Sequence, residues 1–515
     1  MINFRQYPNI TKVVIPRDIK LSDDMIWSYD TFGNMSKIKE VIMHKKIVNS
    51  LKRMGTGSTG RFKYCTNLTG CPMCGINVIE MGSAYQNCYN LTGSPVCGPN
   101  VIDMVHSYMG CYNLTGSPVC GDKVKDMSMT YFNCYNLTGS PVCGPNVTDM
   151  DRTYYGCSNL TGSAACGDKV TGMMMTYQNC YNLTGSACGP NVTNMNWTYT
   201  NCTNLTTAVC GPNVTDMYSS YSNCISLTAA ICGNNVTNMI YAYSNCTNLT
   251  TAVCGPNVTN MAYAYSNCTN LTTAVCGPNV TNMAYAYSNC TNLTTAVCGP
   301  NVTSMYSAYN RCTNLTAAVC GPNVTDIDNS YSNCTNLTTA VCGPNVTDMS
   351  NAYNNCKSLT IAVCGDKVTS MNCAYYNCTN LTTAVCGPNV INMILTYKNC
   401  INLATAVFGP NLMDIQHAYD GCVNVSGNCY IPSKTIAGTR GCFNRRSVNS
   451  MLNIYIHDDI NIIKVFTNNQ KSNSLTCTDI IWTNDATNNR HYNTQANIYI
   501  YPVANVEQAK IDNGD

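Results

Sequence analysis

The sequence predicts a β-rich solenoid built from repeats of about 22 to 23 residues, and three observations support this. Cys, Tyr and Gly occur 37, 35 and 35 times among 515 residues, beside only 7 Phe and 3 Trp. One block, YSNCTNLTTAVCGPNVTNMAYA, occurs twice in succession, at 243–264 and 265–286. Charged residues make up 10% of the chain, against about 25% in ordinary globular domains. A few residue types therefore perform one structural task many times, as in repeat proteins.

Two series of cysteines mark the repeats. The first begins at Cys65 and ends at Cys422, and the second begins at Cys74 and ends at Cys386. The spacing within each series shortens by one partway along the chain. Early repeats read LTGSPVCG where later ones read LTTAVCG, so one residue has been lost between Leu and Cys. We expect this loss at a corner, because in a strand it would reverse the facing of every later side chain.

Composition and charge divide the chain into three predicted parts. Residues 1–63 form degenerate capping repeats, with 12 Lys and Arg against 5 acids, a net charge of +7. Residues 64–422 form the regular solenoid, with a net charge of −6. Residues 423–515 form a capping unit and a small β-rich segment. Its strand-like runs lie at 453–456, 460–466 and 496–501.

One repeat is too short to bury a core alone, so neighbouring repeats must stack. The Leu, Cys, Val, Met and Tyr positions recur at fixed phase and supply the interior, with equivalent residues expected about 5 Å apart. Gly-Pro-Asn is the predicted corner, because Gly accepts backbone angles that other residues avoid and Pro fixes its own. The V-C and V-T segments favour short strands, while the M-x-x-x-Y stretch fits a helical turn or an extended segment.

The repeat resembles the BspA-like, or Treponema-type, leucine-rich repeat, whose usual core is A-F-x-x-C-x-x-L followed by I-x-I-P-x-x-V-x-x-I. The segment YSNCISL at 221–227 carries the first half, and Cys210, Val214 and Met217 fall where the second half places apolar residues. The resemblance covers about residues 7–445, with Tyr for Phe, Cys for an Ile and Pro displaced by one position. It implies a curved, right-handed solenoid of the kind found in surface adhesins of bacteria and protists and in bacteriophage tail or fibre proteins.

Three interpretations of the cysteines compete. Buried thiols that act as small hydrophobic side chains are favoured, because Ile10, Met35 and Phe408 stand at cysteine positions. Disulfides along or between the series are the alternative, since coils about 4.8 Å apart bring Cα atoms within the range of a bridge. Metal binding is the weakest, because the CxxC at 71–74 has no second pair at zinc-finger spacing, so we expect no metal and no cofactor. Representative positions are Cys65, Cys88, Cys111, Cys202, Cys268 and Cys290 in the first series, and Cys210, Cys254 and Cys276 in the second.

Asn-x-Thr occurs in nearly every repeat. In a secretory lumen this motif would signal N-glycosylation. We favour a structural role, in which Asn side chains at one phase hydrogen-bond along the stack and satisfy backbone groups of the turns. The predicted ladder includes Asn182, Asn204, Asn248 and Asn270.

Several functions are disfavoured by composition. A net charge of +2 gives no electrostatic case for nucleic-acid binding. No run approaches the roughly 20 apolar residues that span a bilayer, and the start MINFRQYPNITK lacks the cationic and apolar regions of a signal peptide. We therefore expect neither Sec export nor membrane insertion. The five His are scattered without a repeated Ser, Asp or Glu partner, so no catalytic residue is predicted.

The basic N-terminal part is a candidate docking surface for an acidic partner, the alternative being a solvated end that keeps solenoids from stacking on one another. Its candidate residues are Lys45, Lys46, Lys52 and Arg53.

A second candidate is an aromatic stripe of Tyr241, Tyr263 and Tyr285, suited to sugars or peptides, although simple packing at a polar rim also accounts for these residues.

The expected function is non-enzymatic presentation of a repetitive surface. The resemblance points to a bacteriophage virion component, a tail fibre or surface decoration, that attaches to a host surface. Its partners would be other virion or surface-assembly proteins and a host cell-surface protein or glycan. The alternatives are a cellular BspA-like adhesin at the cell surface and an intracellular protein-interaction scaffold. We expect the basic N-terminal part to attach to the parent assembly, with the strand-like run near residues 498–503 as the competing anchor.

Overall fold

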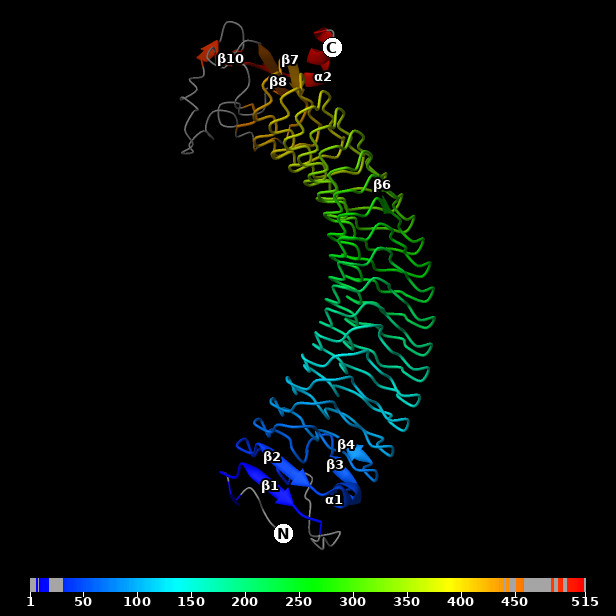
Figure 1. Cartoon of the computed structure of the whole chain (residues 1–515). Coiled ribbons are helices and arrows are strands. Elements are labelled where there is room, and N and C mark those ends of the chain that lie inside the picture. Colours follow the sequence, from blue (N-terminus) through cyan, green and yellow to red (C-terminus); the bar gives the residue numbers. More distant parts are fainter. Residues whose placement is uncertain are drawn as a thin grey trace. The chain divides into compact units, whose positions relative to one another are not determined.

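The computed structural model describes residues 6–7, 9–17, 31–434, 436, 438, 441–443, 451–457, 483–485, 490–493 and 498–513. The chain forms two compact units, Met1–Val258 and Thr259–Asp515. Within each unit the chain winds into stacked coils, one for each repeat (Figure 1). The predicted solenoid, with one coil for each cysteine-marked repeat, is confirmed.

The first unit begins with two irregular coils. β1 (Lys12–Ile15) pairs in parallel with β2 (Glu40–Met43). In the second of these coils Met35 is buried at a cysteine position, and Phe32 stacks 5.4 Å from Phe62 at the phase of the buried tyrosines. The first coil is looser, because Tyr7 is 57% exposed.

A short helix and a strand pair lead into the regular coils. Helix α1 (Lys45–Ser50) is capped at its N-terminus by His44, whose Nδ1 accepts the N–H of Lys46. β3 (Arg53–Gly55) then pairs in parallel with β4 (Glu80–Met81). No helix in the described ranges is both long and apolar enough to cross a bilayer.

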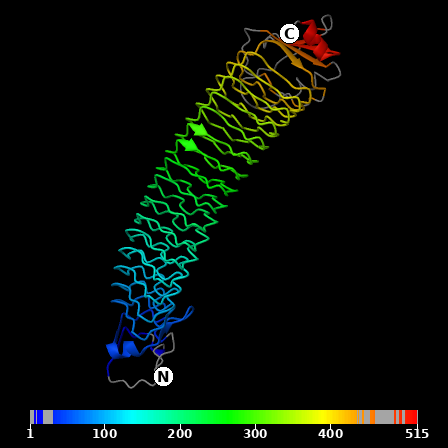
Figure 2. The ribbon, with the colours of Figure 1, turned by 90° about the vertical axis from the view of Figure 1, so that its right-hand side faces the viewer.

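Regular strands are scarce in the described coils. β5 (Thr273–Ala274) and β6 (Thr295–Ala296) pair in parallel and are the two green arrows side by side in Figure 2. The other pairings between regular coils are mostly isolated bridges, such as Asp103 with Asp126. The prediction of short strands at V-C and V-T is therefore wrong for most repeats.

The buried tyrosine explains why V-C does not form a strand. The Oη of Tyr108 accepts the N–H of Val96 at 3.1 Å and donates to the carbonyl oxygen of Val96 at 2.7 Å. Tyr131 makes the same reciprocal pair with Val119, which stands at the equivalent place in its coil. Because the phenol occupies both backbone groups, they do not pair with a neighbouring coil. The hydroxyl thus gives a reason for Tyr where the usual core of the repeat has Phe.

The M-x-x-x-Y stretch is neither helical nor extended. The N–H groups of His106 and Tyr108 donate to carbonyls of the next coil at 3.1 and 2.9 Å, while those of Ser107 and Met109 close turns within their own coil at 2.9 and 3.2 Å. Alternate N–H groups thus bond between coils and within a coil. In each regular coil the residues two before and two after the buried tyrosine have positive φ, here His106 at 57° and Gly110 at 73°.

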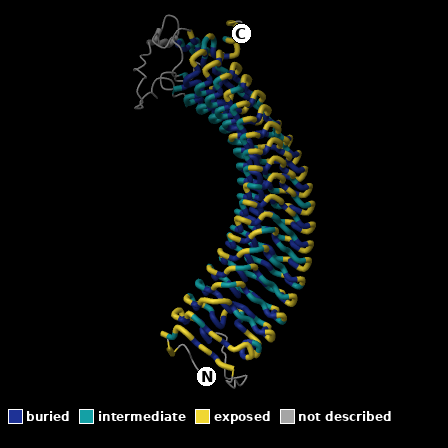
Figure 3. Tube along the Cα trace, viewed as in Figure 1, coloured by how far each residue is buried: buried dark blue, intermediate teal, exposed yellow. Residues whose placement is uncertain are grey.

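The interior of each unit is a set of stacked columns. The Leu, Val, Met, Tyr and first-series Cys positions are buried in successive coils, which appear as dark blue segments in Figure 3. Ring centroids of Tyr85 and Tyr108 lie 5.5 Å apart in the first unit, and those of Tyr287 and Tyr309 lie 5.6 Å apart in the second. These distances agree with the expected spacing of about 5 Å.

Close contact, not backbone angle, requires the corner glycine. The φ of Gly211 is not in the positive range, but a Cβ there would lie 2.8 Å from both Cys188 Sγ and the carbonyl oxygen of Gly189. The predicted reason for this glycine is therefore wrong. Positive φ occurs at the glycine of the early LTG segments, such as Gly93 at 83°. That Leu-Thr-Gly segment contains the extra residue of the longer, early repeats. It precedes the residue whose backbone groups bond to the buried tyrosine, which is Val96 in this coil.

The second unit ends in a sheet with the strand order β7-β8-β11-β10-β9. β7, β8 and β11 are parallel, and β10 is antiparallel to both of its neighbours. The predicted runs at 453–456 and 496–501 correspond to β8 and β11, whereas 460–466 and Cys477 lie outside the described residues. Helix α2 packs against β7 and β8. The bounds are β7 (Gly427–Ile431), β8 (Leu452–His457), β9 (Thr483–Asp485), β10 (Arg490–Asn493), β11 (Ile498–Val503) and α2 (Val506–Asp512).

Candidate binding surface

Three positions beside each buried tyrosine differ between most coils. They are the residues three and two positions before it and one position after it, which in the coil of Tyr154 are Asp151, Arg152 and Tyr155. All three of these side chains are half-buried. We call these three places in each coil the variable positions.

The contrast with other outer positions is large. Two residues before the tyrosine, the first unit reads Ser, His, Met, Arg, Met, Trp, Ser and Tyr from Ser83 to Tyr241. The second unit reads Tyr, Tyr, Ser, Asn, Asn, Cys, Leu and His from Tyr263 to His417. The corner position, by comparison, is Asn or Lys in every repeat from Asn77 to Asn411. Exposure alone therefore does not produce the variation.

Backbone conformation does not select these residues either. The residue two before the tyrosine has φ between 52° and 58° in every regular coil, including Trp197 and Leu395. The residue two after the tyrosine has similar φ, yet there it is almost always Asn or Gly, which tolerate that region best. Large side chains in the left-handed region are unfavourable by roughly 1 kcal/mol or more. Backbone conformation thus gives no reason for most residues at the variable positions, although a few bond to the next coil, as when Asp151 Oδ1 accepts the N–H of Met174 at 2.8 Å.

The predicted aromatic stripe lies on the variable positions. In the first unit Tyr241 contacts Tyr218 edge-on at 6.0 Å. In the second unit Tyr263 stacks on Tyr285 at 4.4 Å, and Tyr285 contacts Tyr306 edge-on at 5.3 Å. Tyr218 and Tyr306 were missed because they occupy a different position in the repeat, three residues before the buried ring.

Acidic side chains follow the tyrosines in the second unit. Asp326 and Asp348 pair in a bridge between adjacent coils, and Asp326 Oδ1 accepts the N–H of Asp328 at 2.8 Å. The pKa of Asp328 is raised to about 6, mainly by burial and also by the charges of Asp348 and Asp326. Among the described residues, no Lys, Arg or His lies within ion-pair distance of these three carboxylates.

The cysteines of the first series face the interior. Cys202 Sγ donates to the carbonyl oxygen of Tyr177 in the preceding coil at 3.1 Å. Burial raises the pKa of Cys65 to about 12, so this thiol keeps its proton at neutral pH. None of the cysteines that the structure describes forms a disulfide. The predicted first-series positions Cys65, Cys88, Cys111, Cys202, Cys268 and Cys290 are all buried.

The second series lies nearer the surface than expected. Cys210 and Cys254 are half-buried, while Cys276 is buried. Cys210 Sγ lies 3.7 Å from the thioether sulfur of Met217. In most coils the Sγ of the second-series cysteine lies where a Cβ on the corner glycine of the next coil would stand. The cysteines of this series therefore require glycine at the corner.

Asparagines form more than one ladder. At the predicted positions, Asn204 donates to Asn182 at 3.3 Å, and Asn270 accepts from Asn292 at 3.4 Å; Asn248 is exposed at the same phase. These bonds join side chains, whereas the corner asparagines bond to the backbone. Two further ladders were missed, one at the positive-φ Asn and one at the corner. Their bonds include Asn201 to Asn179 at 2.7 Å and Asn213 to the carbonyl of Pro190 at 2.8 Å.

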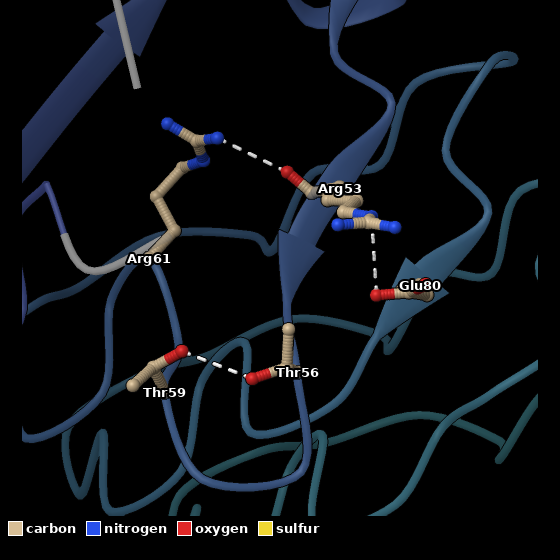
Figure 4. A network of polar contacts seen from close by, with 5 residues as sticks. All are labelled: Arg53, Thr56, Thr59, Arg61 and Glu80. Carbon is tan, nitrogen blue, oxygen red and sulfur yellow. Dashed lines mark hydrogen bonds and ion pairs between the residues drawn. The ribbon is translucent and has the colours of Figure 1, made fainter. Parts of the chain in front are cut away.

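The basic candidates differ in how their charge is compensated. Lys45, Lys46 and Lys52 are exposed. Arg53 is also exposed, but its Nε lies 3.2 Å from Glu80, and its carbonyl oxygen accepts from Arg61 (Figure 4). Arg53 therefore contributes less uncompensated charge than the three lysines.

Potential catalytic groups do not converge in the described coils. Cys373 and His417 occupy the same position two coils apart, with Leu395 between them. His417 lies 3.3 Å from Asp420, and burial raises the pKa of Cys373. The arrangement therefore lacks a contact between nucleophile and base. The part of the chain that the structure describes also has no group of three His, Cys, Asp or Glu that fits a metal ion.

Comparisons with known proteins agree with this geometry. A family model described as BspA type leucine rich repeat region matches residues 126–250, 173–294, 262–382 and 306–426, which together cover more than half of the chain. The chain is similar to a leucine-rich repeat protein from Bacteroides ovatus ATCC 8483, with 14% identity and a TM-score of 0.52 over 65% of this chain and 91% of that chain. It is also similar to a leucine rich cell surface protein from Faecalibacterium prausnitzii A2-165, with 14% identity and a TM-score of 0.34 over 68% and 87%. No curated protein matches the sequence.

Proposed function

Because the chain belongs to the BspA-type leucine-rich repeat family, we propose that it is a non-enzymatic attachment protein that binds a macromolecule at a cell or particle surface. The variable positions carry this proposal. The interior columns and corners repeat almost unchanged, whereas the variable positions change between most coils, and backbone conformation does not select their residues. Repeat proteins bind partners through such extended surfaces.

We expect the carrier to be a bacteriophage particle, with the cell surface as the alternative. The support is the occurrence of similar repeats in phage tail or fibre proteins and in microbial surface adhesins. Mass spectrometry of purified virions, of cell-surface fractions and of cytosol from the producing culture separates the two carriers. Recovery in the virion or surface fraction supports an attachment protein. Recovery in the cytosol alone would replace it with an intracellular scaffold.

We further propose that the basic N-terminal part attaches the protein to its carrier. Exposed Lys45, Lys46 and Lys52 support this, since an exposed cationic patch favours an acidic partner. Retention on the carrier should weaken as salt rises well above 0.15 M, where the Debye length is about 8 Å.

A charge-matched pair of variants tests the attachment. The variant K45E/K46E/K52E should be released from the carrier. The control K123E/K169E/K367E makes the same charge change at exposed Gly-Asp-Lys corners and should stay bound. Equal retention of both variants would shift the anchor to the C-terminal sheet that contains β11.

A further inference from the structure

We propose that the variable positions of the second unit, together with two neighbouring aspartates, bind an arginine-rich segment of a partner protein. This inference rests on the proposed function and specifies the chemistry of the partner. The patch comprises Tyr263, Tyr285, Tyr306, Asp326, Asp328 and Asp348.

These six residues form one continuous strip in successive coils. Tyr263, Tyr285 and Tyr306 contact one another in order, at 4.4 and 5.3 Å. Bridges then join the coil of Ser304 to that of Asp326 and the coil of Asp326 to that of Asp348. The pKa of Tyr306 is raised first by its interaction with Tyr285, and also by the charges of Asp328 and Asp326. The aromatic and acidic halves therefore adjoin.

The negative charge of the three aspartates favours binding of a cation. The carboxylates of Asp326, Asp328 and Asp348 lie close enough to raise the pKa of Asp328, and no described Lys or Arg pairs with them. Asp328 accepts a hydrogen bond from Asn329 Nδ2 at 2.8 Å and is also hydrogen-bonded by the side chain of Asn351 in the next coil, but both partners are neutral amides. A guanidinium would neutralise this repulsion, and its planar donors suit carboxylates.

The tyrosines favour arginine over lysine. A guanidinium stacks on aromatic faces and is more weakly hydrated than an ammonium, so less water must be removed from it. Tyr263, Tyr285 and Tyr306 are half-buried, which leaves part of each ring open to a partner. An arginine-containing chain can thus place one side chain on the rings and another between the carboxylates.

The irregularity of the surface favours a protein over a regular polysaccharide. A homopolymer offers the same group to every coil, so it would match coils that present the same residues. The variable positions instead change from Tyr to Asp within the patch and from Tyr to Leu and His further along the second unit. An irregular partner surface is the matching ligand, and proteins have such surfaces.

The test uses the full chain and a fluorescein-labelled peptide with four copies of Arg-Ser-Gly, compared with Lys-Ser-Gly and Glu-Ser-Gly peptides by fluorescence anisotropy. The arginine peptide should bind most tightly and the glutamate peptide should not bind. The variant D326N/D328N/D348N should weaken binding about tenfold or more. Its control D122N/D168N/D366N makes the same charge change at exposed corners and should change affinity less than about twofold.

The triple variant should keep its fold, because Asn stands at the same place in other coils. In one of them Asn282 Oδ1 accepts the N–H of Ala284 at 3.0 Å, as Asp326 does from Asp328. Circular dichroism and the unfolding midpoint check this. A second pair of variants covers the rings: Y285A/Y306A should weaken arginine binding more than lysine binding, whereas Y135A/Y181A, at exposed tyrosines of the first unit, should leave both unchanged.

Three results would overturn the inference. They are no binding of the arginine peptide, equal loss in D326N/D328N/D348N and its control, and binding by the lysine peptide as tight as by the arginine peptide. Binding of a regular glycan through these tyrosines, without binding of the arginine peptide, would likewise overturn the inference. None of these results changes the fraction in which the protein is recovered, so the attachment function is judged separately.

Discussion

The phenol oxygen of Tyr108 lies 3.1 Å from the backbone nitrogen of Val96 and 2.7 Å from its carbonyl oxygen, so one side chain satisfies both groups. The ring itself stacks between Tyr85 and Tyr131 at 5.5 and 5.6 Å. Each such tyrosine therefore joins two walls of its own coil and also packs against its neighbours. The buried tyrosine thus stabilises the repeat both by hydrogen bonds within its coil and by ring stacking between coils.

Replacing Tyr108 with Phe should destabilise the first unit. The ring would stay in its stack, but the N–H and carbonyl of Val96 would lose their partner, which costs about 1–3 kcal/mol when such groups are shielded from water. Urea unfolding measures the loss, and amide exchange at Val96 locates it. Tyr135→Phe, at a tyrosine that is 41% exposed, is the control and should change little. Equal stability of the two variants would show that the hydrogen bonds of Tyr108 to Val96 are unimportant.

The corner should not accept a Cβ. Gly211→Ala places a methyl group 2.8 Å from Cys188 Sγ and from the carbonyl oxygen of Gly189, so overpacking should cost about 1–3 kcal/mol. Gly57→Ala meets nothing within 4 Å and serves as the control. Thermal unfolding compares the two variants. A Gly211→Ala protein as stable as its control would refute the close-contact explanation.

Stability should fall in alkaline solution. Burial raises the pKa of Cys97 from 9.0 to about 11, and similar shifts recur along the second series. Because the folded state raises these pKa values, the thiols contribute full stability below about pH 9 and lose it as pH rises toward 11. Urea midpoints measured between pH 7 and pH 11 should therefore decline above pH 9. A constant midpoint across that interval would contradict the burial of protonated thiols.

The cysteines should react as free thiols once the chain is unfolded. Alkylation under denaturing, non-reducing conditions should modify most of the 37 residues, as read by intact mass. In the native protein exposed Cys71 should react before buried Cys202, which is shielded from the reagent. If most thiols resist until reductant is added, the disulfide alternative is correct.

The repeat period in the sequence was sufficient to predict the stacked coils, but it was not sufficient to predict the backbone conformation within each coil. Equal spacing identified which residues share a phase, and so placed Tyr108 and Cys111 inside. It carried no information on dihedral angles, so the positive φ of His106 and the alternate use of its neighbouring N–H groups were not predictable. Short strands were expected at V-C because the residue types favour them, but the tyrosine hydroxyl takes the backbone groups that a strand would use.

The binding surface was only partly predictable. Tyr263 and Tyr285 were identified as part of a stripe because each stands two residues before a tyrosine at the buried phase. Tyr306 and Asp328 were missed because they stand one position earlier in the repeat, and only the coil geometry places Tyr306 near both Tyr285 and Asp328. Aligning all coils by the buried tyrosine, and asking which positions change, is the sequence signal that could have found them.

The most direct test of whether the variable positions serve binding is to transfer the variable residues of one coil into another. The double variant Asp328→Ala/Asn329→Tyr gives the coil of Tyr331 the same variable residues as the coil of Tyr265. The unfolding free energy should fall by only about 1 kcal/mol, the cost of placing Tyr instead of Asn at the left-handed backbone position 329, while the arginine peptide binds more weakly. A large loss of stability, or unchanged binding, would contradict the claim that these positions serve binding rather than folding.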